Sequence, residues 1–440
     1  MILKIYFVLQ LCSGSLTVFK KLLLNTKKIK NADNIFINSQ GFGHSVLDSI
    51  LFIENFGHRS LVISLGTEFN QKPGTERNRF FDKCLKKNLI GIYFPSIFLR
   101  KHNWKYMHPL TKIFLKIFLV VLNKNNYMIY EDNRKLAENV VPNVIGKKLN
   151  INLDDARLIT HSITKSFMTA ENHHHAAGYL PFLMKGPTID ISPIANECNG
   201  SLLRIIHSRL LGADLICLAI RRGDAPYHSR ADYYFDAIDM IKSKGFQVTL
   251  IGDRKYFFDL AKERNYSLES KLNNYDVTDR EQKLFELFAI QNCKFIFGDQ
   301  GGVWSLVRAF NMPGLIINAT PSSQLQYNVE SLPRKWIYQS TGAEMLDVNK
   351  IFGELFFRWK AVPSRNIELN KTDNLISVEN DKEFILQVLE RYIKDRKYEI
   401  PSKLQEIVKV NFPDNIFLRL AENSSYSPDY IEKLVGWPTK

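Results

Sequence analysis

Short apolar runs alternate with amphipathic stretches between residues 214 and 318, and this alternation restricts the possible folds most strongly. The predicted elements, in chain order, are strand 214–220, helix 231–243, strand 247–252, helix 279–291, strand 294–298, helix 303–310 and strand 314–318. Gly245 stands where the first of these helices should stop. Repeated strand–helix–strand units with short connections form parallel sheets, so a doubly wound α/β unit is expected here.

The first 200 residues carry a weaker form of the same pattern. Apolar runs at 34–38 and 60–67 predict two further strands, the first of which leads into a glycine-containing turn and a helix. Residues 126–140 and 155–162 are interpreted as later pieces of this half. A polar stretch at 185–201, which carries Gly, Pro, Asn and Ser, predicts a domain boundary.

The chain of 440 residues is long enough for two or three domains. The expected parts are an apolar and basic helical leader (1–33), a first α/β half (34–195), a second α/β half (196–375) and a helical tail (376–440). The tail contains the strongly amphipathic segment DKEFILQVLERYIKD, which predicts a helix. Two α/β halves of this kind predict a two-lobed enzyme.

The chain carries an excess of positive charge. Its 59 Lys and Arg residues against 45 Asp and Glu give a formal net charge of +14, which favours an anionic partner. Much of the excess lies before residue 150, in segments 20–30, 100–105 and 147–148. Since no basic tract is interleaved with aromatic residues as in nucleic-acid-binding motifs, no nucleic-acid partner is expected.

Two segments combine apolar and basic residues. Residues 5–19 are apolar but too short and too interrupted for a membrane span, and the basic cluster follows them instead of preceding them. Residues 108–124 place Lys112, Lys116 and Lys124 beside a broad apolar face. Both segments favour a cytoplasmic protein with a peripheral contact on the anionic inner face of the cytoplasmic membrane. An ordinary N-terminal helix packed on its own domain is the alternative for the first segment.

Disulfide and metal chemistry are not expected. The five cysteines are scattered without metal-ligand spacing, so they are interpreted as reduced thiols of a cytosolic protein, with Cys217 and Cys293 in strand cores. Three consecutive histidines, His173 to His175, point in different directions, and no carboxylate cluster accompanies them at ligand spacing. The sequence therefore predicts no metal and no cofactor.

Ligands of an open parallel sheet bind beyond the carboxyl ends of its strands, and four such places carry unusual residues. After strand 34–38 come Gly41, Gly43 and His44. The two glycines permit a close approach of backbone to ligand, and the start of the following helix offers N–H groups. A tight turn in which His44 merely starts the helix is the structural alternative.

The second place follows strand 214–220. The residues predicted to contact a phosphate, a ribose or a sugar there are Arg221, Arg222, Asp224, Tyr227, His228 and Arg230. Two adjacent arginines at the end of a buried strand are costly unless they meet anions, whose oxygens match the planar guanidinium donors. At least one of the two is therefore expected to bind a ligand phosphate, while the other could form a salt bridge with Asp224 or Asp232.

The last two places follow strands 247–252 and 294–298. Gly252 permits the turn after the first of these strands, and Asp253 taken alone is most typical of a cap on the next helix. Both residues are included in the predicted donor-binding set. After the second strand a glycine-rich turn leads directly into a helix, an arrangement that suits a diphosphate. Its predicted contact residues are Asp299, Gly301, Gly302 and Ser305. Asp299 could accept a hydrogen bond from a sugar or ribose hydroxyl, or orient one of the arginines.

Three segments of the second half resemble the two-lobed GT-B glycosyltransferases of bacterial surface-polysaccharide clusters. They are IRRGDAPYHSRADYYFDAI, KGFQVTLIGD and CKFIFGDQGGVWSLVRAFNMPGLIIN. The arginine loop is also similar to the His-x-Arg-Arg-Gly-Asp signature of fucosyltransferases that use GDP-fucose, in which an arginine holds the donor diphosphate. Ala219 stands at the histidine position of that signature, and this departure puts GDP-fucose itself in doubt.

The resemblance implies two Rossmann-like lobes, with the acceptor on residues 34–195 and the nucleotide-diphosphate sugar on residues 196–375. It implies a metal-independent hexosyl or deoxyhexosyl transfer to a glycan or a lipid-linked acceptor. A positive cluster would stabilise the leaving diphosphate. His44 would deprotonate the acceptor hydroxyl, with Asp48 one helical turn further on as its orienter or substitute. The alternatives are a nucleotide-sugar epimerase of the same fold and a non-catalytic sugar-nucleotide-binding protein.

Overall fold

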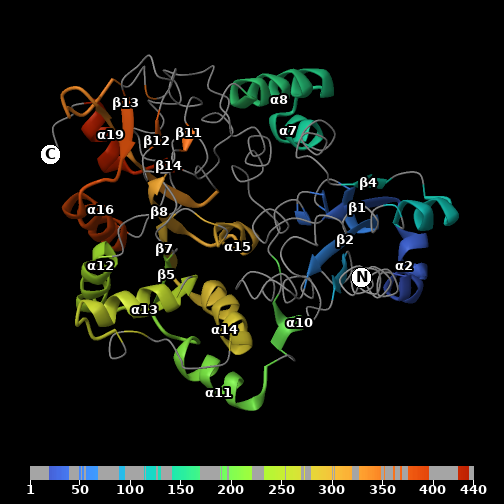
Figure 1. Ribbon diagram of the computed structural model, residues 1–440, viewed down its shortest axis with the longest axis horizontal. Coiled ribbons are helices and arrows are strands. Elements are labelled where there is room, and N and C mark those ends of the chain that lie inside the picture. Colours follow the sequence, from blue (N-terminus) through green and yellow to red (C-terminus); the bar gives the residue numbers. More distant parts are fainter. Residues whose placement is uncertain are drawn as a thin grey trace, which may run out of the picture. The chain divides into compact units, whose positions relative to one another are not determined.

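The computed structural model divides into two compact units (Figure 1). Unit 1 consists of Met1–Leu136 and Ile189–Glu197, and unit 2 of Ala137–Thr188 and Cys198–Lys440. The structure describes residues 19–38, 49–50, 52–53, 56–67, 89–94, 113, 115–124, 127–129, 141–168, 189, 191–195, 198–220, 232–252, 254–268, 272, 279–299, 301, 303–319, 327–347, 351, 360–361, 367–368, 375–395 and 425–435. The chain divisions predicted at residues 33, 195 and 375 stay predictions.

Unit 1 is built on a four-stranded parallel sheet in the order β3-β2-β1-β4. The strands are β1 (Asn34–Asn38), β2 (Ser60–Thr67), β3 (Leu89–Phe94) and β4 (Tyr127–Ile129). The first two coincide with the predicted strands, since both are short apolar runs bounded by polar residues. Ser60 pairs with Asn34, so both strands start at the same edge of the sheet.

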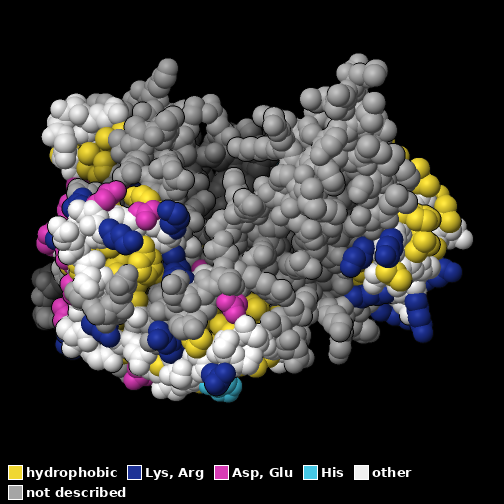
Figure 2. All heavy atoms as spheres, turned by 60° about the horizontal axis from the view of Figure 1, so that its bottom comes forward, with side chains coloured by type: hydrophobic (Ala, Val, Ile, Leu, Met, Phe, Trp, Pro, Cys, Tyr) yellow, Lys and Arg dark blue, Asp and Glu magenta, His cyan; other side chains and the backbone are white. Residues whose placement is uncertain are grey.

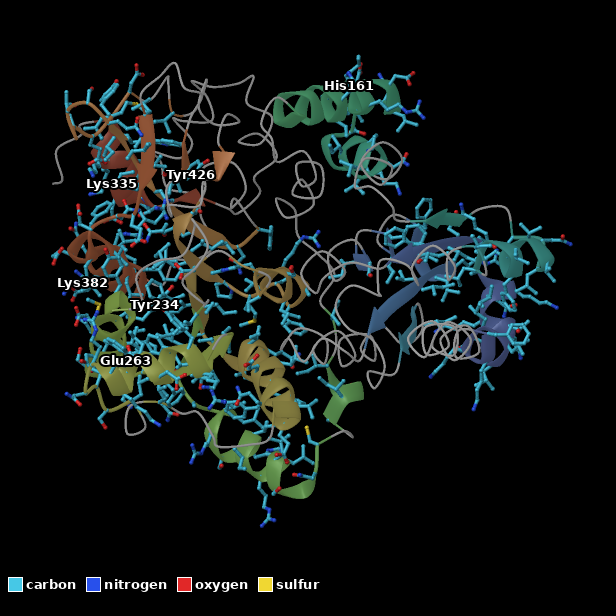
Figure 3. All side chains as sticks on the ribbon, viewed as in Figure 1. His161, Tyr234, Glu263, Lys335, Lys382 and Tyr426 are labelled. Atoms are coloured by element: carbon cyan, nitrogen blue, oxygen red, sulfur yellow. The ribbon has the colours of Figure 1, made fainter. Side chains whose placement is uncertain are left out.

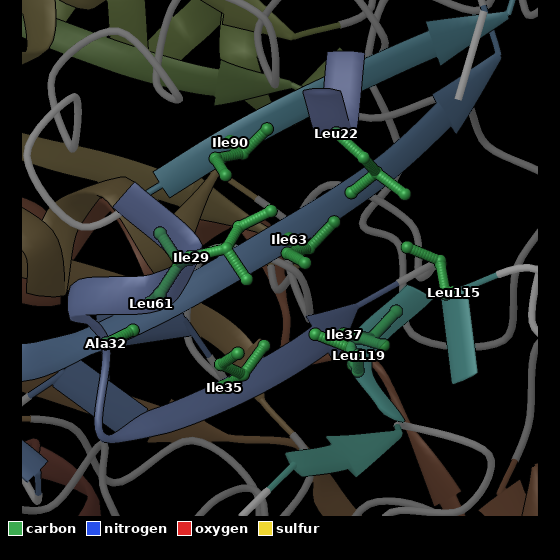
Figure 4. Close-up of a cluster of buried hydrophobic side chains, with 10 residues drawn as sticks. All are labelled: Leu22, Ile29, Ala32, Ile35, Ile37, Leu61, Ile63, Ile90, Leu115 and Leu119. Carbon is green, nitrogen blue, oxygen red and sulfur yellow. The ribbon is translucent and has the colours of Figure 1, made fainter. Parts of the chain in front are cut away.

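One face of this sheet carries a compact apolar core (Figure 4). The sheet residues in it alternate along their strands, as expected when every second side chain points to the same face, and they are Ile35, Ile37, Leu61, Ile63 and Ile90. Helical residues 19–24, α2 (Thr26–Asn31) and helical residues 115–121 pack on this face through Leu22, Ile29, Leu115 and Leu119. Within the described ranges, no helix is both long enough and apolar enough to cross a bilayer.

Unit 2 contains a six-stranded sheet in the order β14-β9-β8-β7-β5-β6, in which every neighbouring pair is parallel. Its strands are β5 (Leu215–Ile220), β6 (Gln247–Gly252), β7 (Phe295–Asp299), β8 (Gly314–Ala319), β9 (Val329–Pro333) and β14 (Ser425–Tyr426). All residues of β5, β7 and β8 are buried, because a parallel sheet is covered on both faces. The predicted α/β fold class with parallel sheets is confirmed.

Helices alternate with these strands as predicted, and each predicted boundary lies within one residue of the observed one. The helices between the strands are α12 (Asp232–Ser243), α13 (Arg254–Glu263), α14 (Asp279–Asn292) and α15 (Trp304–Ala309). Gly245 follows α12 with a φ of 87°, a value that suits glycine after a helix. Tyr234 of α12 contacts the rings of Phe257 and Phe297 edge-on, at centroid distances of 6.2 and 5.8 Å (Figure 3). This contact fixes α12 and α13 against β7.

Two of the cysteines of unit 2 lie side by side in the core. Cys217 is buried within β5, as predicted, and burial raises the pKa of its thiol well above the ordinary value. Cys293 is also buried but precedes the first residue of β7 by two positions, so its predicted place within the strand is wrong.

Several elements in the second half of the chain and just before it are not predicted from the sequence. A small antiparallel sheet in the order β10-β13-β12-β11 consists of β10 (Lys335–Tyr338), β11 (Lys360–Ala361), β12 (Ile367–Glu368) and β13 (Leu375–Val378). The helix pair α7 (Val141–Leu149) and α8 (Leu153–Met168) belongs to unit 2, although unit 1 contributes segments on both sides of it in the sequence. Two other short helices are α10 (Ser192–Ala195), in unit 1, and α11 (Gly200–Arg209).

The C-terminal segment takes part in the main sheet. It contains the predicted helix, α16 (Lys382–Asp395), and a second helix, α19 (Pro428–Val435), while β14 between them pairs with β9. The guanidinium of Arg391 in α16 joins these parts, because it contacts the carboxylates of Glu330 in β9 and Asp429 in α19. All three side chains are at most 23% exposed, so the network is largely shielded from water.

Further ion pairs hold α16 against its surroundings. Lys382 Nζ lies 2.7 Å from Asp236 Oδ2 in α12, and Lys335 Nζ of β10 lies 2.7 Å from Asp381 Oδ2 (Figure 3). These pairs are more exposed than the Arg391 network, so each contributes about 0–1 kcal/mol to stability. The apolar face of α16, which includes Tyr392 packed edge-on against Phe295 of β7, supplies most of its attachment.

Candidate active site

The strand order of unit 2 reverses beside β5. From β5 the chain passes through α12 to β6 on one side, and then through α13 and α14 to β7 on the other side. The carboxyl ends of β5 and β7 therefore flank a topological switch point, which is where open α/β sheets bind their ligands. Ala219 near the end of β5 pairs with Gly298 near the end of β7. This pair marks the candidate site.

Both glycines that flank the end of β5 are required by the backbone. Gly298 has a φ of 152°, and a Cβ atom on it would lie 2.2 Å from the carbonyl oxygen of Ala219. Gly252 has a φ of 102°, and a Cβ atom there would lie 2.1 Å from the carbonyl oxygen of Ile220. No other residue can take these positions without moving the strands. The last two residues of β5 thus have a glycine without a side chain packed directly against their carbonyl groups on either side.

The glycine-rich turn after β7 is fixed by a tryptophan. The Nε1–H group of Trp304 donates to the carbonyl oxygen of Asp299 over 2.7 Å, and the backbone N–H of Trp304 donates to the carbonyl oxygen of Gly301. The indole ring lies over Gly314 of β8, where a Cβ atom would be 2.5 Å from the ring carbon Cζ3. Trp304 therefore sets the shape of the turn, a role that the sequence does not predict.

Asp299 and Ser305, two predicted contact residues, are nearly buried, with exposed fractions of 3% and 2%. Ser305 lies in the first turn of α15, as predicted. α15 is only six residues long, so its macrodipole is weaker than that of a longer helix. Local backbone donors at the turn, more than the macrodipole, would therefore interact with an anion.

A buried arginine lies within electrostatic reach of Asp299. Arg334, directly after β9, is 1% exposed, and its desolvation lowers the pKa of the guanidinium to about 10. Nearby negative groups, first Glu379 and then Asp299, favour its charged form and partly offset the desolvation. At neutral pH Arg334 thus remains a cation beside Asp299. Arg334 is not predicted as a site residue, because the sequence does not predict β9, the strand that places it at the edge of the sheet.

A buried amide network holds the neighbouring strand ends. Asn318 of β8 has a φ of 49°, and its Oδ1 accepts hydrogen bonds from the backbone N and from Nδ2 of Asn380, at 2.7 and 3.0 Å. Asn380 Nδ2 also donates to the carbonyl oxygen of Pro333 over 2.7 Å. The residue before Arg334 is thereby tied to the end of β8. This network therefore holds the backbone directly before Arg334 in place at the site.

The structure brings four of the predicted site residues to the carboxyl edge of the unit 2 sheet, namely Gly252, Asp299, Gly301 and Ser305. The others lie outside the described residues, so their roles stay predictions; they are Gly41, Gly43, His44, Asp48, Arg221, Arg222, Asp224, Tyr227, His228, Arg230, Asp253 and Gly302. Arg221 and Arg222 nevertheless follow directly on Ile220, the last residue of β5. The chain therefore leads into the arginine pair at the switch point.

Among the described residues, no three His, Cys, Asp or Glu side chains lie together in a group that could hold a metal ion. The consecutive histidines, His173 to His175, lie outside those residues. His161 is exposed on α8 (Figure 3).

No protein-family model matches the chain, and no curated protein matches it. Among solved structures, E. coli ADP-heptose LPS heptosyltransferase II has a TM-score of 0.36 and 12% identity, with 68% of this chain and 90% of that chain covered. The E. coli heptosyltransferase WaaC with ADP has a TM-score of 0.36 and 11% identity, with 68% and 90% covered. A glycosyl transferase family 9 protein from Veillonella parvula DSM 2008 has a TM-score of 0.39 and 11% identity, with 69% and 87% covered. Scores this low carry no argument about activity.

Proposed function

We propose that the protein is a glycosyltransferase that moves a sugar from a nucleotide-diphosphate donor to a glycan or a lipid-linked acceptor. The observation that carries the proposal is the place of Arg221 and Arg222 in the sequence. They directly follow the last residue of β5 at the topological switch point, next to the strand that ends in Gly298 and Asp299. Two guanidinium groups at this edge suit the diphosphate of a sugar nucleotide.

The chemistry needs positive charge where the leaving group forms. As the bond to the sugar breaks, negative charge grows on the departing diphosphate, and fixed cations at the strand end would stabilise it without a metal ion. Asp299 would accept hydrogen bonds from a ribose or sugar hydroxyl. Asp299 lies within electrostatic reach of the Arg334 cation, and its carboxyl oxygens can serve as hydrogen-bond acceptors.

The acceptor hydroxyl must lose a proton during transfer. His44 is the proposed general base, with Asp48 one helical turn further on as its orienter or substitute. The acceptor would be held by residues 34–195, where Gly41 and Gly43 permit close backbone approach. If His44→Ala keeps near-parental transfer while Arg221→Ala and Arg222→Ala lose it, the base assignment fails.

Donor binding is tested first, by thermal unfolding in the presence of UDP-, GDP-, CMP-, dTDP- and ADP-sugars. ADP-sugars are included because two of the solved structures named above carry ADP or ADP-heptose in their names. A donor at 100 times its Kd should add about 2.7 kcal/mol of stability, or roughly 5–10 °C in Tm. Arg221→Gln and Arg222→Gln should abolish this shift, while Arg264→Gln, an exposed arginine after α13, should keep it. No stabilisation by any of these donors would refute the proposal.

Turnover then separates the proposed function from its two alternatives. A transferase consumes the donor at a substantial rate only when an acceptor is added, whereas an epimerase converts the donor alone. A sugar-nucleotide-binding protein is stabilised by the donor but leaves it unchanged under both conditions. Donor conversion followed by chromatography, with and without a cell-envelope glycolipid extract as acceptor source, distinguishes the three outcomes.

A further inference from the structure

Unit 1 exposes an apolar surface formed by two segments that are distant in the sequence. Helical residues 19–24 and 115–121 pack on the same face of the β1–β4 sheet (Figure 4). The chain that follows each segment is joined by a hydrogen bond, which Lys124 Nζ donates to the carbonyl oxygen of Ala32 after α2 over 2.6 Å. Since both segments bury one side in the core on this face, their opposite sides point away from the sheet.

The outer sides carry large apolar side chains. Leu24 lies two residues after the buried Leu22, and Val121 two residues after the buried Leu119, so each is turned about 200° around its helix from the core. Their exposed fractions are 72% and 73%. The apolar members of this surface, all between 50% and 73% exposed, are Phe19, Leu23, Leu24, Ile113, Ile117, Val120 and Val121. We call them, with the lysines among them, the basic apolar face.

The charge on this face has a single sign. Exposed lysines lie on both segments and on α2, which directly follows the first segment, and they are Lys20, Lys21, Lys27, Lys30 and Lys116. Neither residues 19–32 nor residues 113–124 contain an Asp or a Glu. Figure 2 shows apolar side chains next to Lys and Arg side chains at the edge of the molecule where α2 lies. Apolar and basic side chains together suit a partner surface that has an apolar interior and anionic groups at its boundary with water.

The other large apolar side chains exposed in the described residues lack this combination. Leu153 and Leu158 lie on α8, whose first turn carries Asp154 and Asp155, and Leu211 and Leu346 stand singly. Scattered exposed leucines are ordinary in soluble proteins, whereas a contiguous apolar face rimmed by one sign of charge is typical of an interaction site. The basic apolar face is thus distinct from the rest of the described surface.

We propose that the basic apolar face docks on an anionic lipid bilayer, with its leucines and valines among the acyl chains and its lysines at the headgroups. Apolar insertion and attraction to anionic lipid act together in such helices. A second copy of the chain is a poorer occupant. In a two-fold dimer the same patch faces itself, so lysine would face lysine. The proposal does not depend on the transferase assignment.

Co-sedimentation of the full chain with vesicles tests the proposal. The protein should bind vesicles of phosphatidylcholine with phosphatidylglycerol, and it should bind vesicles of pure phosphatidylcholine at least 30-fold more weakly, which corresponds to the attraction of about two lysines. Lys20→Gln with Lys21→Gln should lower binding about 30-fold for the same reason. Leu24→Ser with Val121→Ser should lower it at least tenfold. The matched control Leu158→Ser, a 68% exposed leucine on α8, should bind like the parent protein.

Each other outcome is informative. Equal binding to both vesicle types, or undiminished binding by the Leu24 and Val121 variant, would overturn the proposal. So would a parent protein that forms dimers which the same variant abolishes, because the face would then be an interface between copies. Raising NaCl from about 0.1 M to about 1 M shortens the screening length from about 10 Å to about 3 Å and should weaken binding. Unchanged Tm values of the variants would show that they remain folded. If the protein binds lipid but no sugar nucleotide stabilises it, the proposed function fails and the lipid-docking proposal stands.

Discussion

Replacing Arg391 should destabilise the protein by an amount that depends on pH. Arg391 Nε lies 2.5 Å from Asp429 Oδ2, and its guanidinium also contacts the carboxylate of Glu330. Burial raises the pKa of Glu330 to about 7, although the Arg391 cation acts to lower it. Arg391→Met removes that cation and keeps most of the side-chain volume. The variant leaves the carboxyl group of Glu330 largely buried without its positive partner.

Removing one member of a buried ion pair costs about 3–5 kcal/mol when the remaining charge stays in place. The folded state binds more protons at Glu330 than the unfolded state between the ordinary pKa of 4.5 and about 7. This contribution to stability is therefore full below pH 4.5 and is lost as the pH rises to 7. Without Arg391 the folded pKa rises further, and each additional unit costs about 1.4 kcal/mol. The loss in the variant should be about 2–3 kcal/mol larger at pH 9 than at pH 6.

Urea unfolding of the full chain at both pH values measures this difference. Tryptophan fluorescence reports mainly on unit 2, which holds four of the five tryptophans, including Trp304 and Trp336 at 1% exposure each. Lys244→Met is the control, because Lys244 pairs with the exposed Glu390 next to Arg391 in the chain, and no measurable pH-dependent change is expected. Adding Glu330→Gln to Arg391→Met should remove the pH-dependent part of the loss. Equal losses at pH 6 and pH 9, or a loss no larger than the control's, would refute the reasoning.

Two further predictions concern the turn at the candidate site. Gly298→Ala places a Cβ atom 2.2 Å from the carbonyl oxygen of Ala219, so it should lower stability by about 3 kcal/mol or more, or prevent folding. Gly245→Ala, at a φ of 87° with open space around it, should cost only about 1 kcal/mol, and similar Tm losses for both would contradict the clash. Trp304→Phe keeps an aromatic ring but removes the donor to the carbonyl oxygen of Asp299, so thermal unfolding should show a loss of about 1–2 kcal/mol. A Trp304→Phe protein as stable as the parent would show that this bond does not hold the turn.

The central strands of unit 2 could be predicted because they are buried on both faces. β5, β7 and β8 are mostly apolar runs with a polar residue near the end or just after it, namely Arg221 after β5, Asp299 in β7 and Asn318 in β8. No long-range contact is needed to recognise such a run. β9 lacks this signal, because it carries Glu330, whose burial depends on Arg391 far along the chain. β14 has only two residues, too few for any periodicity.

The same difference applies to the candidate site. Gly252, Asp299 and Gly301 could be predicted because the carboxyl end of each recognised strand is a known place for ligands. The sequence does not predict Arg334, since it follows the unrecognised β9. The switch point between β5 and β7 depends on strand order, which is set by packing between distant segments and is not written in any local pattern. The structure is therefore needed to show which strand ends lie next to each other at the site.

The pairing of β14 with β9 has a consequence for the newly made chain on the ribosome. Ser425 pairs with Glu330, and at about 5–20 residues per second the intervening segment takes roughly 5–20 s to synthesise. During that time β9 is an open edge strand, which other nascent chains can extend into aggregates. A charged carboxylate within an edge strand discourages such pairing. Glu330 thus protects the incomplete sheet until Arg391 and β14 arrive, and the same residue then helps to close it.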